Sequence, residues 1–408
     1  MFVKKGSAGG MKMNKVKMMN LKKAAAMGLS LLMMAGLLSG CGNGGQTVTA
    51  DSTQVENSQS ADARTGNDQE GSSGTENGQS ADSQTAGGLA ESSAPSGAAA
   101  ASPESDRDAV TIRVGSLKGP TSLGLLTLMD KASKGETLDN YEFQMATGAD
   151  ELLPLVVKGD LDIVLVPANV AAVLYQKTDG DVEVIDINTL GVLYMVTGTA
   201  EVGSIADLKG KTVYLTGKGT TPEASLRYLM DASGLKEEDV ILEFKSEAAE
   251  VAAILAENPD AIGLLPQPFV TAACMQNDSL KTVLDINEEW MRLQNEAGDG
   301  SGMVTGVTVV RKAFLQDNPK AVAAFLEEHA ASAAAINEDP ASGAALAVEA
   351  GIVAKEPIAR TAIPQCNIVC VTGEEMKTAL SGYLNILKDF NAELVGGAVP
   401  GDDFYHIP

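Results

Sequence analysis

Short apolar runs alternate with longer amphipathic stretches from about residue 110 to the end of this chain. Thr111–Ser116, Tyr141–Ala146 and Leu161–Val166 are the first three runs, and a turn and a helix-length stretch follow each of them. Runs of strand length that are separated by helix-length segments favour a sheet with helices on its faces. The alternation therefore predicts an α/β fold with largely parallel strands.

The pattern restarts after about residue 204. Ser204–Lys211 is expected to cap a short helix and turn, and a strand at Thr212–Leu215 and a glycine-rich loop lead into a helix that begins at Pro222. The run Met303–Val310 is interpreted as the strand that returns to the first unit, so two lobes are predicted. Further strands are expected at Val182–Asp186, Val240–Phe244, Ala261–Leu265 and Lys281–Leu284, and helices at Asp150–Val157, Asn169–Gln176, Pro319–Ile336, Pro340–Ala350 and Glu374–Leu394.

The N-terminal part of the chain has a different composition. Residues 42–108 consist mainly of Gly, Ser, Ala, Gln, Thr, Asn, Asp and Glu, with almost no large apolar side chain. Such a composition cannot bury enough apolar surface to offset chain entropy, so a disordered linker is predicted. Before it, a lysine-rich segment precedes an apolar stretch from about Ala24 to Leu38. That stretch is short for a membrane span and typical of a signal peptide.

The signal segment ends in Leu38-Ser39-Gly40-Cys41, which resembles the bacterial lipobox. In proteins with that motif the cysteine is diacylated and the peptide is cleaved before it. We therefore expect lipidation at Cys41 and a location on the outer leaflet of a bacterial cell membrane, facing away from the cytoplasm. An ordinary signal peptide with an incidental cysteine is the alternative. The expected boundaries are 1–40 for the signal peptide, 41–108 for the lipidated cysteine and linker, and 109–408 for the folded part.

Acidic side chains outnumber basic ones, 54 to 30, for a net charge of −24. The segment before Cys41 holds seven lysines and no acid, so the chain from Cys41 onward has 23 basic side chains and a net charge of −31. Nucleic-acid binding requires a basic face and is therefore not expected. The acidic balance keeps a tethered domain soluble and repelled from an anionic membrane surface.

Cysteine and histidine are scarce. Besides Cys41 the chain has only Cys274, Cys366 and Cys370, which do not form a disulfide framework, although pairing between two of them stays open. Cys366 and Cys370 have no histidine near them in the sequence, so no zinc site is expected. Neither a metal nor a cofactor is predicted, and the thiols are interpreted as buried apolar groups.

Three stretches carry a resemblance to a known family. They are Ser204–Val213, Lys158–Ile163, and Val310–Leu315 with Asn318-Pro319. With the lipobox, they resemble ABC-transporter substrate-binding lipoproteins of the nitrate/sulfonate/taurine (NMT1/THI5-like) branch of the type II periplasmic-binding-protein superfamily. The resemblance implies two α/β lobes, two crossovers between them and a ligand cleft, with lobe 1 at about 109–197 and 306–408 and lobe 2 at about 198–305.

The resemblance also implies a function. Such a protein captures a small solute by hinge closure and delivers it to a membrane permease and its ATPase. We expect a monomer and no catalysis, because neither His329 nor His406 lies in a strand-end loop. Two alternatives stay open: a ligand-sensing lipoprotein without transport, and an enzyme of the thiamine-pyrimidine or menaquinone type on the same fold.

Four loops are expected at the carboxyl ends of strands, where open α/β sheets bind ligands at helix N-termini. Lys118 and Lys218 are the only basic residues in two of them and indicate an anionic or zwitterionic solute. Thr121, Ser122 and Thr221 have a competing interpretation as helix caps. The predicted ligand-binding residues are Lys118, Gly119, Thr121, Ser122, Pro167, Asn169, Thr216, Lys218, Thr220, Thr221, Gln267, Thr305 and Asn367.

Two of these residues have further alternatives. Gln267 lies between two prolines, where a simple turn competes with a ligand contact. Asn367 lies in an apolar, strand-like run, Ile363–Val369. It either reaches the cleft or ties down a loop through backbone hydrogen bonds.

Overall fold

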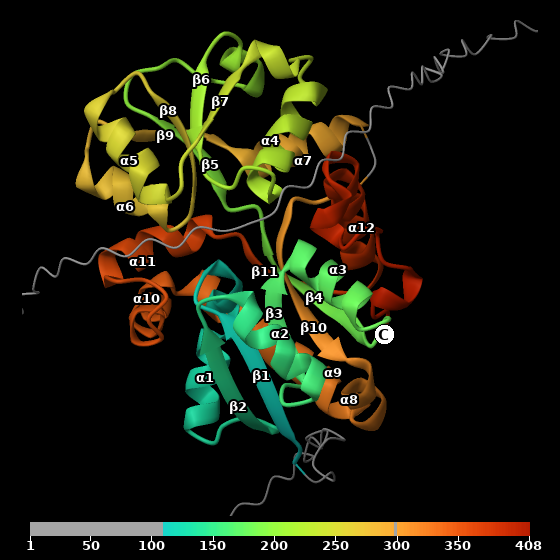
Figure 1. Cartoon of the computed structure of the whole chain (residues 1–408). Coiled ribbons are helices and arrows are strands. Elements are labelled where there is room, and N and C mark those ends of the chain that lie inside the picture. The colour runs from blue at the N-terminus through green and yellow to red at the C-terminus, as the bar shows by residue number, and fades with distance from the viewer. Residues whose placement is uncertain (1–108, 298–299) are drawn as a thin grey trace, which may run out of the picture. The chain divides into compact units, whose positions relative to one another are not determined.

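The computed structural model describes residues 109–297 and 300–408, which fold into two lobes, each around one sheet (Figure 1). Both lobes belong to the same compact unit. The predicted signal peptide, the lipidation site at Cys41 and the predicted linker lie outside the described residues. Within the described ranges, no helix combines the length and the apolar character that crossing a membrane requires.

Lobe 1 contains a six-stranded mixed sheet in the order β11-β4-β10-β3-β1-β2. Strand β1 pairs in parallel with β2 and β3, whereas β10 runs antiparallel between β3 and β4, and β11 pairs antiparallel with β4. The continuous apolar run of β3 is buried on both faces, as expected for a central strand. The prediction of largely parallel strands was wrong for β10 and β11, which pair antiparallel in this sheet. The strands are β1 (Thr111–Leu117), β2 (Asn140–Ala146), β3 (Ile163–Pro167), β4 (Val182–Leu190), β10 (Val304–Arg311) and β11 (Ile368–Val371).

The helices of lobe 1 come from both ends of the described chain. Gly119-Pro120 is followed by a 3-10 turn before the first α-helix, so this helix begins at Leu126 and not near Ser122 as predicted. The elements are η1 (Pro120–Leu125), α1 (Leu126–Ser133), α2 (Ala149–Lys158), α3 (Ala168–Lys177), α8 (Lys312–Asp317), α9 (Pro319–Glu338), α10 (Pro340–Glu349), α11 (Glu356–Ala362), η4 (Ile363–Gln365), α12 (Gly373–Phe390), η5 (Ala392–Val395) and η6 (Asp402–Phe404).

Lobe 2 contains a five-stranded sheet in the order β7-β6-β8-β5-β9. Strand β6 pairs in parallel with β7 and β8, and β5 runs antiparallel to β8 and β9. The strands are β5 (Leu193–Thr197), β6 (Thr212–Leu215), β7 (Ile241–Phe244), β8 (Ile262–Pro266) and β9 (Lys281–Asp285). The helices are η2 (Ile205–Leu208), α4 (Thr221–Ala232), η3 (Glu237–Asp239), α5 (Ala248–Glu257), α6 (Phe269–Gln276) and α7 (Ile286–Ala297).

The chain crosses from lobe 1 to lobe 2 earlier than the sequence indicated. Strand β5, which the predicted boundary at residue 197 leaves in lobe 1, belongs to the sheet of lobe 2. The first crossing is therefore Gly191-Val192, and the second immediately precedes β10. The first crossing requires glycine at position 191, because a Cβ there would come within 3 Å of Asn287 and Met303. The backbone N–H of Gly191 donates to Asn287 Oδ1 at 3.2 Å.

Side chains connect the lobes on two sides of these crossings. On the side of α6 and α11, Gln267 of lobe 2 donates from Nε2 to Oε1 of Gln365 in lobe 1 at 2.7 Å, and the Tyr194 hydroxyl donates to the Gln365 carbonyl at 2.7 Å. On the side of α4 and α12, the hydroxyls of Ser225 and Tyr383 lie 3.2 Å apart. The described conformation thus already holds direct contacts between the lobes.

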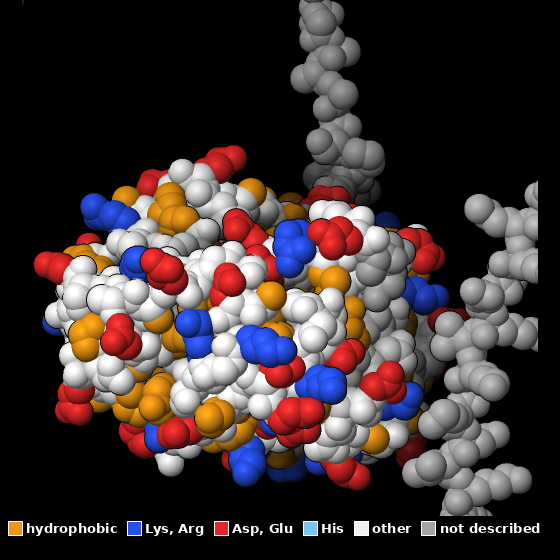
Figure 2. Space-filling view, turned by 90° about the horizontal axis from the view of Figure 1, so that it is seen from above, with side chains coloured by type: hydrophobic (Ala, Val, Ile, Leu, Met, Phe, Trp, Pro, Cys, Tyr) orange, Lys and Arg blue, Asp and Glu red, His pale blue; other side chains and the backbone are white. Residues whose placement is uncertain are grey.

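The surface carries mixed charge. On the face that Figure 2 shows, Lys and Arg side chains are interspersed among Asp and Glu, and apolar side chains form small separate groups. No single basic patch dominates this face, which agrees with the acidic composition.

Candidate functional site

The carboxyl ends of β1 and β3 bring several predicted residues of lobe 1 together. Pro167 at the end of β3 pairs with Gly306 of β10. A Cβ on Gly306 would overlap the Thr121 side chain and Oδ1 of Asn188, so η1 packs against β10 only because this position is glycine. Thr305 precedes Gly306, and Asn169 lies in the first turn of α3. Four predicted residues therefore lie at the same end of the strands of the lobe 1 sheet: Thr121, Pro167, Asn169 and Thr305.

Five polar side chains at the strand ends of the two lobes have no side-chain hydrogen-bond partner among the described residues. Thr121, Asn169 and Thr305 of lobe 1 and Thr216 and Thr221 of lobe 2 make no side-chain hydrogen bond to another residue that the structure describes. All five are buried or half-buried. Since a buried polar group without a partner costs free energy, these groups are suited to bind a ligand or ordered water.

Ser122 has a structural role. It is fully buried, its hydroxyl donates to the carbonyl of Leu117, and its backbone N–H donates to the carbonyl of Gly119 at 3.1 Å. These bonds close the turn between β1 and η1. The structure therefore favours the structural alternative for Ser122 over the predicted ligand contact.

The loop before α4 in lobe 2 is held by local hydrogen bonds. Gly217 and Gly219 adopt positive φ angles of 77° and 74°, and the Thr220 hydroxyl donates to the Gly217 carbonyl at 2.6 Å. The backbone N–H of Gly219 donates to Glu223 Oε2 at 2.7 Å, and Glu223 in turn accepts from Arg227 at 2.7 Å. Thr220 thus stabilises the loop, and the free hydroxyls on either side of it are those of Thr216 and Thr221.

Both predicted lysines are exposed. Lys218 lies over the ring of Phe244, with Nζ 5.8 Å from the ring centroid. Lys118 extends toward the end of α10, where a Cβ on Gly351 would lie 3.7 Å from its Nζ. Gly119, beside Lys118, has open space on its side-chain side. The lysines contribute positive potential near the two loops, but neither is fixed by an ion pair within the described ranges.

Two predicted ligand residues serve the junction between the lobes. The Asn367 amide donates to the Gly191 carbonyl at 2.6 Å, its own carbonyl accepts from Leu190 at 3.0 Å, and its φ is 46°. Of the two alternatives for Asn367, the backbone tie is the one observed. Both amide atoms of Gln267 also have partners within the protein. Its Oε1 accepts from the Thr271 hydroxyl at 2.9 Å, and its Nε2 donates to Gln365.

A buried polar layer that was not predicted from the sequence lies beneath the lobe 1 loops. Asn188 of β4 donates to the Thr308 hydroxyl of β10 at 3.2 Å, and Thr308 donates to Asp186 at 2.9 Å. Thr189 donates to Asn188 Oδ1 at 3.0 Å. The sequence did show polar residues inside an otherwise apolar strand. Their partners on β10 could not be identified without knowing which strands pair.

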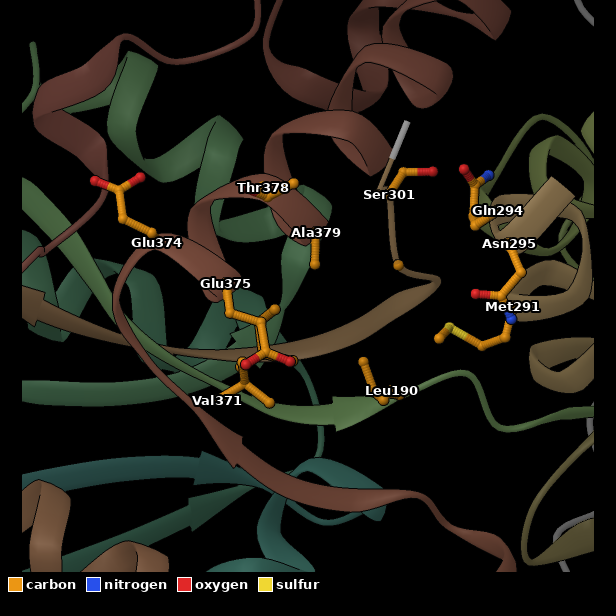
Figure 3. Close-up of a pocket in the computed structure, with 13 residues that line it drawn as sticks. Leu190, Met291, Gln294, Asn295, Ser301, Val371, Glu374, Glu375, Thr378 and Ala379 are labelled. Atoms are coloured by element: carbon orange, nitrogen blue, oxygen red, sulfur yellow. The ribbon is translucent and has the colours of Figure 1, made fainter. Parts of the chain in front are cut away.

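A cavity of about 650 Å³, which we call the hinge pocket, lies beside the second crossing (Figure 3). Met291, Gln294 and Asn295 of α7 form one wall, and Glu375 and Ala379 of α12 contribute to the opposite wall. None of the predicted ligand residues lines it, and its described lining has two glutamates, Glu374 and Glu375, and no basic side chain. An anionic solute is therefore better placed at the strand-end loops than in the hinge pocket.

Comparisons with known proteins agree with this architecture. The family model described as NMT1/THI5 like matches residues 182–342. The chain is similar to the crystal structure of an ABC transporter from Parabacteroides distasonis, with a TM-score of 0.60 and 22% identity over 73% of this chain and 98% of that one. It is also similar to the periplasmic aliphatic sulphonate binding protein SsuA from Escherichia coli, with a TM-score of 0.57 and 15% identity over 75% and 93% of the two chains. No curated protein matches the sequence.

The class of fold follows directly. The chain has the two-lobed α/β fold of periplasmic binding proteins, as predicted. The match to the NMT1/THI5-like model begins at β4 and ends in α10, so it includes all of lobe 2 and both crossings. It agrees with the predicted nitrate/sulfonate/taurine branch.

Proposed function

We propose that this protein is the extracytoplasmic solute-binding component of an ABC importer. It captures a small solute between its lobes and delivers it to a permease and ATPase complex. The observation that carries the proposal is the set of buried or half-buried polar side chains at the strand ends of both lobes that have no hydrogen-bond partner among the described residues. The similar structures named above, an ABC transporter from Parabacteroides distasonis and the periplasmic aliphatic sulphonate binding protein from Escherichia coli, support it.

The proposed solute is a small anion or zwitterion. Thr121, Asn169 and Thr305 supply two hydroxyls and an amide from lobe 1, and Thr216 and Thr221 supply two hydroxyls from lobe 2. The N-termini of α3 and α4 direct backbone N–H groups out of the same loops, which favours negative charge. A solute that bridges the two sets stabilises the closed arrangement of the lobes, which is the form that docks on the permease.

The test is a thermal-shift screen of residues 41–408 against small sulfonates, carboxylates, amino acids, pyrimidines and amines, followed by calorimetric titration of the best ligand. Thr121→Ala and Thr221→Ala should each weaken binding by about ten- to a hundred-fold, the effect of losing a hydrogen bond worth about 1.5–3 kcal/mol to a charged group. Ser122→Ala should instead lower stability by about 1 kcal/mol, since it loses only a bond inside the turn.

Thr282→Ala, on the exposed surface of β9, is the matched control and should leave affinity unchanged. A best ligand that is a bare cation, or full affinity in both the Thr121 and Thr221 variants, would contradict the proposed site.

We also propose that Cys41 carries the membrane anchor, on the sequence of Leu38-Ser39-Gly40-Cys41 alone. Cys41→Ser should release the protein into the medium or leave it unprocessed. Mass spectrometry of the mature wild-type N-terminus should find a lipid-modified Cys41, and any other N-terminal residue would refute the anchor.

A further inference from the structure

Three side chains with metal-ligating atoms meet in the interior of lobe 1. Asp186 lies on β4, His329 on α9 and Cys370 on β11, and one ligand atom of each lies within 4.8 Å of the other two. Asp186 and His329 are fully buried, whereas Cys370 is only partly covered. No histidine lies near Cys370 in the sequence. The fold brings His329 to it from a separate helix.

We propose that Asp186, His329 and Cys370 bind a single Zn²⁺ ion. Carboxylate oxygen, imidazole nitrogen and thiolate sulfur are all zinc ligands, and the soft thiolate disfavours Mg²⁺ and Ca²⁺. Asp186 Oδ2 and His329 Nδ1 are 3.2 Å apart. Two ligands that are each about 2.0–2.1 Å from a tetrahedral zinc ion lie about 3.3 Å from one another, so this pair already has the required separation.

Charge balance favours an ion at this position. The Asp186 carboxylate is buried with the Thr308 hydroxyl and the His329 ring as its polar partners, and no lysine or arginine in the described ranges bonds to it. Burial and, after it, the Asp186 carboxylate raise the pKa of the Cys370 thiol. Zn²⁺ reverses that effect, because two anionic ligands and a dication form a neutral site that a protein interior tolerates.

The proton balance is simple. Cys370 releases its thiol proton to solvent when its sulfur binds the ion. His329 Nδ1 faces the Asp186 carboxylate and carries the ring proton in the metal-free protein. When Nδ1 binds the ion, that proton moves to Nε2, a buried atom that has no hydrogen-bond partner among the described residues. Metal binding should therefore release protons and weaken as the pH falls.

Neighbouring residues orient the carboxylate. Thr308 donates to Asp186 Oδ1 at 2.9 Å and accepts from Asn188 at 3.2 Å. Hydrogen bonds of this kind fix a metal ligand and strengthen the site. Because Asn188 also lies against Gly306 and Thr121, the proposed ion would hold β4, α9 and β11 together directly beneath the lobe 1 loops.

The first experiment measures metal content. The full chain, purified without chelators in the presence of ZnCl2, should contain one zinc ion per molecule by elemental mass spectrometry. After treatment with EDTA, added ZnCl2 should raise the melting temperature, and MgCl2 should not. Cys370→Ser and His329→Gln should each weaken zinc binding by about a hundred-fold or more, and Thr308→Val by about ten- to a hundred-fold.

Cys274→Ser, on α6 of lobe 2, is the matched control and should retain full zinc binding. A second readout does not depend on the variants folding. Cys370 is partly exposed but the pKa of its thiol is raised, so a maleimide applied at alkaline pH should label it slowly in the metal-free protein. Zinc should abolish that labelling, while Cys274 keeps its labelling rate. Wild-type protein that takes up no zinc, or a Cys370→Ser variant that binds zinc as tightly as the wild type, would overturn the proposal.

Discussion

The two lobes present their strand-end loops in different ways. In lobe 1, Thr121 is almost fully buried and rests on Gly306 and Asn188, residues that are distant in sequence. In lobe 2, the loop before α4 is closed by hydrogen bonds among residues 217–223. Tertiary packing thus positions the polar groups of lobe 1, and local hydrogen bonds position those of lobe 2. Substitutions in lobe 1 should therefore affect the stability of the whole lobe, and those in lobe 2 should affect the loop.

The same contrast holds for the buried acids, and the largest effect is predicted there. Asp162 of lobe 1 is 1% exposed and accepts from Arg113 and Arg311 on two different strands, each at 2.6 Å. Glu223 of lobe 2 pairs with Arg227 one turn along its own helix. Asp162→Asn should lower the free energy of unfolding by about 3 kcal/mol, near the lower end for a broken buried pair because both arginines are partly exposed. Glu223→Gln should lower the free energy of unfolding by only about 1 kcal/mol. Urea unfolding measures both variants.

The stabilisation by Asp162 should depend on pH. Burial would raise the pKa of Asp162, but hydrogen bonds from Arg113 and Arg311 outweigh burial and hold the pKa below its ordinary value. The stabilisation is fully present above the ordinary aspartate pKa of about 4 and is lost as the pH falls through the lowered value of the folded state. Asp162→Asn should lack this part of the acid dependence. Equal acid profiles for variant and wild type would show that Asp162 is not the coupled group.

An intermediate effect is predicted at Gly306. Gly306→Val should destabilise the protein by about 2–3 kcal/mol, because the new side chain overlaps Thr121 and Asn188. The control is Gly119→Ala, where a Cβ meets open space and the backbone φ is −179°, a value that any residue adopts. Thermal melts that rank the two variants equally would show that η1 does not depend on close packing against β10.

The smallest effect is predicted in lobe 2. Gly217→Ala should cost about 1 kcal/mol, because alanine is strained at a φ of 77°. The loop can relax without disturbing the core, so the urea midpoint should shift slightly and the slope should not change. A loss as large as that of Gly306→Val would mean that the lobe 2 loop is not locally determined.

Local signals in the sequence were sufficient for much of the fold. The predicted strand Thr212–Leu215 coincides with β6, and the predicted helices of the C-terminal third are present. The boundary between the lobes was misplaced, because Leu190–Val196 is a nearly continuous apolar run that includes the last residue of β4, the crossing and most of β5. A crossing of this kind is determined by which strands pair, and single-sequence periodicity does not contain that information.

The candidate site shows the same limit. Glycine, proline and threonine at strand ends identified the loops, since those signals lie next to one another in the sequence. The partners of Asn188, Asp186 and Gln365 lie on distant elements. Their roles depend on side-chain pairs that form only when the strands and helices assemble.

Leu190 and Val304, the residues on either side of the two crossings, are direct partners across the antiparallel pair β4 and β10. All of lobe 2 is therefore a single continuous insertion in what would otherwise be an ordinary hairpin of lobe 1. A two-residue turn could join the two strands in its place and leave the order of the lobe 1 sheet intact. The second lobe is thus encoded by one contiguous segment of the gene, which could be acquired, exchanged or lost as a unit. One half of a cleft could then be replaced while the other half keeps its fold.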